Sequence, residues 1–170
     1  YTIHLSQTTW ERDFMQKWHG LTPPAFLDRY GFLGPRLFAA HCRYVDDADI
    51  AMLARSRTII SHQAGMAANR GNIPPIYKLR AAGCPIALGT DNNVNDVFEV
   101  MRIALLTERI DRNDDFPGTV PQPEDVFIDA TQGGALATRG NGGVVEAGKK
   151  ADLIVVNMMQ AHLVPAGRFL

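Results

Sequence analysis

The sequence predicts an α/β fold built from parallel strand–helix units. Short apolar runs typical of strands alternate with helical patterns along most of the 170 residues, and these units recur at roughly the 25 to 35 residues that a βα unit occupies. With 46% hydrophobic residues, the chain is able to bury one sizeable core. Two architectures remain open at this level: an open doubly wound sheet and part of a (β/α)8 barrel.

The predicted elements follow from apolar runs and from local start and stop signals. The strands are placed at residues 1–5, 36–40, 58–61 and 85–89. Thr22 followed by Pro23 marks the start of a helix, because threonine is a good N-cap and proline fits the first turn. Asp46 and Asp49 have the spacing of a capping box for the next helix. Two later helices are predicted at residues 73–82 and 94–110, the second with an apolar stripe that includes Val97.

Polar side chains stand at the carboxyl end of each predicted strand. They are His4, His41, His62 and Asp91. One such histidine is a weak signal, since it is usually an ordinary structural or surface residue. In a βα-barrel, however, the carboxyl ends of the strands converge on one face, where active sites are built. Three histidines and an aspartate at one mouth therefore predict metal-binding and acid–base chemistry, although polar residues that merely mark where strands leave the core would give the same pattern.

Composition excludes several function classes. A formal net charge of -1 and a pI near 6.6 give no electrostatic signature of binding to nucleic acid or to an anionic membrane. No segment approaches the roughly 20 apolar residues that span a bilayer, and no signal-peptide pattern is recognisable. Cys42 and Cys84 form no metal-binding or disulfide pattern; both are expected to be buried, in a cytoplasmic protein.

Five sequence blocks resemble successive parts of the amidohydrolase superfamily, in its cytosine deaminase-like and chlorohydrolase-like branch. They read "IHLSQT", "AAHCRYVDDADIAMLA", "SHQAGMAANRG", "LRAAGCPIALGTDNN" and "GGVVEAGKKADLIVV". The resemblance implies a metal-dependent (β/α)8 TIM-type barrel with a small β-sandwich domain. Residues 1–139 would then be the second half of the barrel, strands five to eight with a linking helix near 123–138. Residues 140–170 would be part of the composite β-sandwich domain, with strands near 143–157. Within this stretch, Gly148 to Lys150 are expected to form a turn, and Asp152 is expected to stand at the entry to a buried strand.

The same resemblance implies roles for individual residues. His4 and Asp91 would bind one divalent metal ion, zinc or iron, and Asp91 would also move protons. His41 would orient the attacking water and stabilise the developing oxyanion, and Asn92 would contact the substrate. Because the first-strand His-x-His pair of the family is absent from this sequence, two protein ligands remain where a catalytic zinc usually has three.

A second departure from the family concerns residue 7. Deaminases of this group have His-x-x-Glu here, with the glutamate protonating a ring nitrogen of the substrate, whereas this chain has Gln7. Glutamine donates hydrogen bonds but no proton at neutral pH. Gln7 is therefore expected to bind substrate, and His62 either supplies the proton or simply packs. Glu11 is expected to face solvent or to form a pair along its helix.

These observations favour a metal-dependent hydrolase that cleaves C–N bonds by deamination, or C–Cl bonds, in a small heterocyclic substrate of the nucleobase or triazine kind. Two alternatives remain: a catalytically inactive fragment that lacks the N-terminal metal-binding half, and a non-metal α/β binding domain. The expected partners are the substrate and either a second copy, giving a homo-oligomer, or the missing N-terminal half. Neither nucleic acid nor a membrane is expected.

Overall fold

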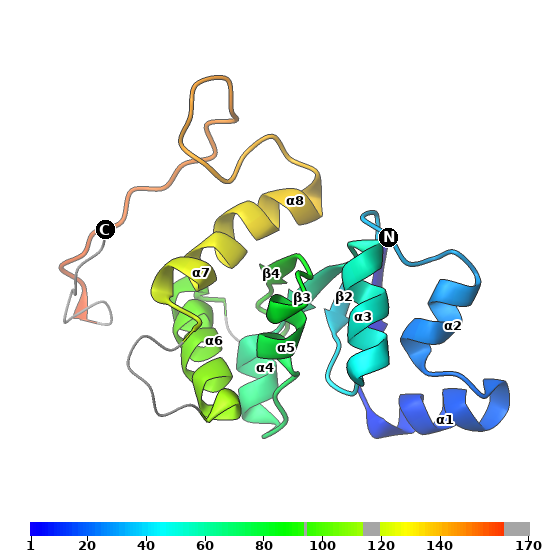
Figure 1. The fold of residues 1–170 in the computed structure, drawn as a ribbon. Coiled ribbons are helices and arrows are strands. Elements are labelled where there is room, and N and C mark those ends of the chain that lie inside the picture. Colours follow the sequence, from blue (N-terminus) through cyan, green and yellow to red (C-terminus); the bar gives the residue numbers. More distant parts are fainter. Residues whose placement is uncertain (94, 114–119, 162–170) are drawn as a thin grey trace.

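A sheet of parallel strands forms the centre of the computed structural model, which describes residues 1–93, 95–113 and 120–161 (Figure 1). The sheet order follows the chain order without a reversal, and every neighbouring pair is parallel. A doubly wound sheet reverses its strand order at a switch point, so this order is that of a barrel segment. The predicted α/β fold is confirmed. The strands are β1 (Thr2–Leu5), β2 (Phe38–His41), β3 (Ile59–His62) and β4 (Ile86–Leu88).

Helices connect each strand to the next and continue after the last one. One or two helices lie between successive strands, and a nearly continuous helical stretch with a π-helical turn, η1, follows the long helix after β4 (Figure 1). In chain order they are α1 (Thr9–His19), α2 (Pro23–Arg29), α3 (Asp47–Ser56), α4 (Ala64–Asn69), α5 (Ile76–Ala81), α6 (Val97–Arg112), α7 (Pro123–Ile128), η1 (Asp129–Gly133) and α8 (Gly134–Thr138).

The helix starts that the sequence predicts are confirmed by their capping bonds. The Thr22 side chain accepts the Ala25 N–H at 3.3 Å, with prolines in the first turn. Asp46 accepts the Asp49 N–H at 2.8 Å, and the Asp49 carboxylate accepts the Asp46 N–H at 3.3 Å, which completes the predicted capping box. These local bonds satisfy N–H groups that no helix can pair internally, and so fix where each helix begins.

The main core lies between the sheet and the helices that cover it, and a second cluster lies under α6. Cys42 and Cys84 are free thiols buried in the main core, as expected. On α6, Val100 and Ala104 face the second cluster. Val97 is 46% exposed, so its predicted place on the inner stripe is wrong. The main cluster comprises Leu5, Ala39, Cys42, Ile50, Leu53, Ile60, Ile76, Leu79, Cys84 and Ile86.

An ion cluster of one partly exposed arginine and two buried carboxylates joins three of the outer helical segments. Arg80 of α5 donates from Nε and Nη2 to the Glu108 carboxylate of α6, at 3.1 and 3.0 Å. The same guanidinium donates from Nη1 and Nη2 to Asp129 of η1, at 3.2 and 2.8 Å. Burial, and then the nearby Glu108, raise the pKa of Asp129 to about 6 although Arg80 opposes the shift. The cluster ties segments far apart in the sequence to one side of the barrel segment.

The strands expected near residues 143–157 are absent from the structure, which describes this stretch completely. The predicted turn forms, with Gly148 at φ 85° and a Lys149 N–H that donates to Glu146 O at 3.2 Å. After it, Ile154 and Val155 are 79% and 102% exposed, and Asp152 is exposed instead of entering a buried strand. A strand needs a neighbour for its backbone hydrogen bonds, and no described segment provides one. The assignment of 140–170 to a separate domain stays a prediction.

Within the described residues, no helix has the length and apolar character needed to cross a bilayer.

Candidate active site

The structure brings His4, His41 and Asp91 together at the carboxyl end of the sheet. His4 and His41 come from neighbouring strands, and their rings meet edge-on with centroids 5.0 Å apart. Asp91 follows β4 and lies close enough to oppose the lowering of the His41 pKa. The convergence predicted from the strand ends is therefore present for these three residues.

Left-handed backbone conformations are concentrated at this end of the sheet. Ser6, His41, Cys42 and Asp91 have φ values of 49°, 76°, 47° and 55°. Non-glycine residues rarely adopt this region, and each such residue costs about 1–3 kcal/mol unless its surroundings hold it there. The strain lies beside the predicted chemistry, at the ends of β1, β2 and β4, where the chain turns side chains toward the mouth.

His41 is buried and neutral. Only 3% of its surface is exposed, and its Nδ1 has no hydrogen-bond partner among the described residues. Burial lowers the pKa of His41 to about 4, and the nearby Arg43 and His4 add to this, while Asp91 acts in the opposite direction. A neutral imidazole carries one N–H donor and one acceptor, so His41 is able to donate a hydrogen bond at pH 7 without being charged.

Sequence reasoning missed Arg43, a buried arginine that follows His41 by two residues. Its side chain is 8% exposed, and Nε and Nη2 find no acceptor in the described part of the chain. Burial and the nearby Arg70 lower the pKa of Arg43. The signal in the sequence was its position two residues after His41, a histidine predicted to belong to the site.

His62 reaches the same end of the sheet from β3 but is almost completely covered. It is 1% exposed, and both ring nitrogens lack partners within the described residues. Burial lowers the pKa of His62 to about 3, helped by the charges of Arg80 and Arg43. The ring is neutral at pH 7, so it is not an acid that carries an extra proton. Its part in substrate binding stays a prediction.

Glu11 anchors the turn between β1 and α1. Its carboxylate accepts the backbone N–H groups of Ser6 and Gln7, each at 2.8 Å. The expectation that Glu11 faces solvent or pairs along its helix is therefore wrong, because the left-handed Ser6 folds the chain back over the start of α1. Gln7 is partly exposed, with its backbone held by this contact.

Asn92 is exposed beside the mouth. Its backbone N–H donates to Asp91 Oδ1 at 2.7 Å. The structure thus places the residue next to Asp91, and the substrate contact predicted for its side chain stays a prediction.

The chain offers an incomplete set of metal ligands. His4 and Asp91 are the right kinds of donor for zinc or iron, a nitrogen and a carboxylate oxygen. However, no three His, Cys, Asp or Glu side chains are arranged to hold a metal ion anywhere in the described ranges. His4 and Asp91 are donors of the right type for a divalent ion, but two protein ligands are fewer than the three that a catalytic zinc site usually has.

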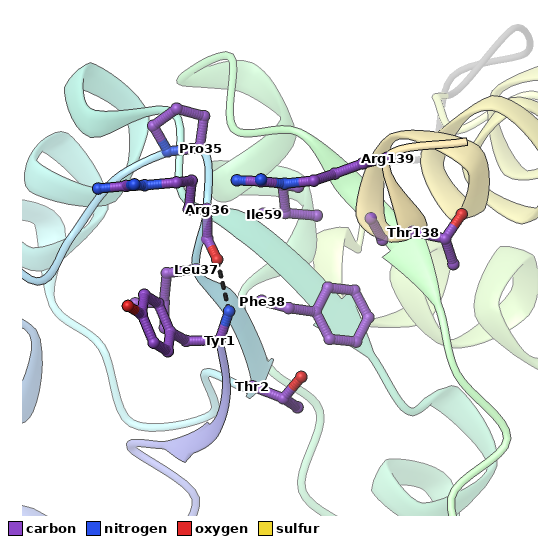
Figure 2. Close-up of a pocket in the computed structure, with 10 residues that line it drawn as sticks. Tyr1, Thr2, Pro35, Arg36, Leu37, Phe38, Ile59, Thr138 and Arg139 are labelled. Atoms are coloured by element: carbon purple, nitrogen blue, oxygen red, sulfur yellow. Dashed lines mark hydrogen bonds between the residues drawn. The ribbon is translucent and has the colours of Figure 1, made fainter. Parts of the chain in front are cut away.

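A pocket of about 560 Å³ lies at the opposite, amino end of the strands. Figure 2 shows Tyr1, Thr2 and Phe38 beside Thr138 and Arg139 from the end of α8. The pocket contains none of the predicted site residues and no carboxylate or histidine. It is a gap between the start of the sheet and α8, at the end opposite to the predicted site residues.

Comparisons with known proteins show the family of the chain. Residues 1–167 match the model of the Amidohydrolase family. The chain is 37% identical to 5'-deoxyadenosine deaminase of Methanothermobacter thermautotrophicus and 36% identical to 5-methylthioadenosine/S-adenosylhomocysteine deaminase of Thermococcus kodakarensis, in each case over 96% of this chain and 39% of the relative. It therefore spans about two fifths of the length of these relatives.

Solved structures give the same fold. An adenosine deaminase from Xanthomonas campestris with bound zinc superposes with a TM-score of 0.88 and 28% identity, over 97% of this chain and 38% of the other. A zinc complex of the atrazine chlorohydrolase TrzN from Arthrobacter aurescens has a TM-score of 0.76 and 23% identity, over 88% and 34% of the two chains. The match of the family model over residues 1–167 shows that the chain belongs to the amidohydrolase family.

Proposed function

We propose that the protein is a metal-dependent hydrolase that deaminates a small, nucleobase-like heterocycle. One observation carries the proposal: His4, His41 and Asp91 lie together at the carboxyl end of parallel strands in an amidohydrolase chain. The relatives named above support C–N cleavage, since both curated relatives are deaminases that act on adenosine derivatives by name. Cleavage of a C–Cl bond in a triazine is the second candidate, supported by the likeness to the chlorohydrolase fold.

His4 and Asp91 would hold the metal, with further ligands from outside the described residues. Zinc is the better supported ion because structural neighbours were crystallised with it, and iron remains possible within the same donor chemistry. A divalent ion, when bound, lowers the pKa of water from about 15.7 to about 7 and so supplies a nucleophile at neutral pH.

The chain's own residues would then move the protons and stabilise charge. The Asp91 carboxylate accepts the proton of the attacking water and returns it to the leaving amine. His41, neutral at pH 7, donates a hydrogen bond to the negative charge that develops on the substrate, a contribution of about 3 kcal/mol for one well-placed donor. Its burial makes the contribution larger than it would be in water.

Gln7 would orient the ring by hydrogen bonds and leave its protonation to another group. An amide donates and accepts hydrogen bonds but does not release a proton at neutral pH. The proposal therefore favours substrates whose ring nitrogen needs no proton from residue 7, with Asn92 as a second polar contact. Two buried, free cysteines suit a reducing compartment, and we place the protein in the cytoplasm on that ground.

The test is Asp91→Asn in the full product of the gene, loaded with zinc. Ammonia and chloride release from aminopurines, aminotriazines and chlorotriazines would be measured with Asp13→Asn as the control, since Asp13 is exposed and pairs only with the neighbouring Arg12. We expect Asp91→Asn to lose at least about 100-fold in kcat, the typical contribution of a general acid–base group, with an unchanged melting temperature.

Two results would count against the proposal. An Asp91→Asn variant that keeps a tenth of the activity would exclude the assigned role. No turnover of any of these heterocycles by the zinc-loaded wild type would favour the inactive fragment, or the non-metal binding domain if zinc is also not retained.

A further inference from the structure

Gln63 makes a side-chain bridge between strand ends that the proposed mechanism does not use. It lies directly after β3 and is 8% exposed. Its Oε1 accepts the backbone N–H of His41 at 3.0 Å, and its Nε2 donates to Ser61 Oγ at 2.5 Å. Both bonds are buried, so the amide has a fixed orientation, with its acceptor toward β2 and its donor toward β3.

The bond to His41 is made where the pairing of β2 with β3 ends. The last paired residues are Ala40 and Ser61, and His41 then enters the left-handed region at φ 76°. The Gln63 amide adds a buried side-chain acceptor for the His41 N–H at this point. A buried hydrogen bond makes a net favourable contribution to stability, so Gln63 stabilises His41 in its strained conformation.

Gly89 supplies the space for the bridge. It follows β4, two residues before Asp91, and its N–H donates to His62 O at 3.0 Å. A Cβ at this position would lie 2.7 Å from Gln63 Nε2 and 3.2 Å from Ser61 Oγ. The Gln63 amide therefore occupies the space that any side chain at residue 89 would need, and the ends of β2, β3 and β4 meet at this one group.

We propose that Gln63 is a positioning residue for His41, and that Gly89 is glycine because the bridge passes over it. The functional part of this inference rests on the proposed role of His41 in hydrolysis. Gln63 acts by fixing the backbone from which the imidazole projects.

The first measurement is the hydrogen-exchange rate of the His41 backbone amide, which NMR monitors in the wild type and the variants. Gln63→Met removes both bonds and is expected to speed exchange of this amide at least about tenfold. Gln63→Glu keeps the acceptor and should retain most of the protection. Gln16→Met is the matched control, because Gln16 is an exposed residue on α1. An unchanged exchange rate of the His41 amide in Gln63→Met would show that Gln63 does not hold this amide, and would overturn the proposal.

The second measurement is a double-mutant cycle with Gly89→Ala. Alanine displaces the amide without a forbidden backbone angle, since the φ of Gly89 is not in the left-handed region. We expect Gly89→Ala to speed His41 exchange as Gln63→Met does, and to have little further effect when combined with Gln63→Ala. Equal effects of Gly89→Ala in both backgrounds would show that the glycine serves another purpose and would overturn the steric part.

Turnover by the full gene product then distinguishes a role of Gln63 in positioning His41 from a purely structural role. For the best substrate found above, Gln63→Met should lower kcat about tenfold with KM within twofold, and Gln63→Glu should recover most of the loss. Lost amide protection with unchanged kcat would overturn the positioning role. If the wild type hydrolyses nothing, the proposed function fails, while the exchange data and the cycle still decide whether the bridge exists.

Discussion

Two arginines in this protein, Arg43 (buried) and Arg80 (partly buried), have opposite surroundings. Arg80, among the outer helices, places its guanidinium against two carboxylates, Glu108 and Asp129. Among the described residues, two guanidinium nitrogens of Arg43, at the mouth of the sheet, have no acceptor, and the like-charged Arg70 is its strongest electrostatic neighbour. In the described part of the chain, the outer layer compensates its charges internally, whereas the mouth leaves charged and polar groups unpaired. This difference separates the part of the molecule that holds the fold from the part that is available for chemistry.

Among the substitutions that test this difference, Arg80→Met is expected to have the largest effect on the free energy of unfolding. Arg80→Met would leave two buried carboxylates facing each other without a cation, and we expect a loss of about 3–5 kcal/mol in the free energy of unfolding. Urea denaturation measures it, with Arg55→Met as the control, because Arg55 is 60% exposed and its pair with Asp28 contributes at most about 1 kcal/mol. Equal losses in the two variants would mean that the ion cluster does not stabilise the fold.

At the mouth, a pH-dependent effect of intermediate size is expected from His62. Its pKa in the folded chain is about 3, against about 6.5 in an unfolded chain. A lowered folded pKa gives stability that is fully present above pH 6.5 and is lost as the pH falls toward 3. His62→Phe should remove this loss.

Stability of wild type and His62→Phe would be compared at pH 7 and pH 4.5. We expect the wild type to lose about 2–3 kcal/mol more than the variant over this interval, since each pH unit in the window is worth about 1.4 kcal/mol. Any packing cost of the larger ring cancels in the difference between the two pH values. Parallel pH profiles would show that folding does not lower the pKa of His62.

The smallest expected effect is at Arg43. Arg43→Met replaces an unpaired buried cation by an apolar side chain of similar length, so we expect the free energy of unfolding to stay the same or to rise by about 1 kcal/mol. Thermal and urea unfolding of the two proteins under identical conditions measure the change. A loss comparable to that of Arg80→Met would remove the distinction between the two arginines.

Local signals account for the elements that the sequence predicted correctly. Thr22 and Asp46 cap their helices through contacts within three residues, which a sequence displays directly. The convergence of His4, His41 and Asp91 followed from topology alone, because parallel strands in chain order bring their carboxyl ends together. The family resemblance added the expected half-barrel and the metal chemistry.

What escaped prediction depends on contacts between distant or strongly turned segments. Arg80 meets Asp129 across 49 positions of sequence, and the bridge from Gln63 to His41 requires two strand ends to be adjacent in space. Glu11 was misplaced because the left-handed conformation of Ser6, which brings it to the end of β1, leaves no mark in the sequence. The strand expected after Gly148 failed because apolar periodicity predicts a strand's character and not the presence of its neighbour.

The uncovered stretch Leu153 to Val155 has a consequence for the handling of this chain in a cell. Consecutive aliphatic residues with high β propensity and open backbone groups are a template for self-assembly into cross-β aggregates. Charged side chains at Lys149, Lys150 and Asp152 stand immediately before them, in the place where natural sequences carry gatekeepers against aggregation. In the 170-residue chain as given, replacing those three charges by neutral residues is expected to raise the tendency of this exposed stretch to aggregate, which light scattering would measure.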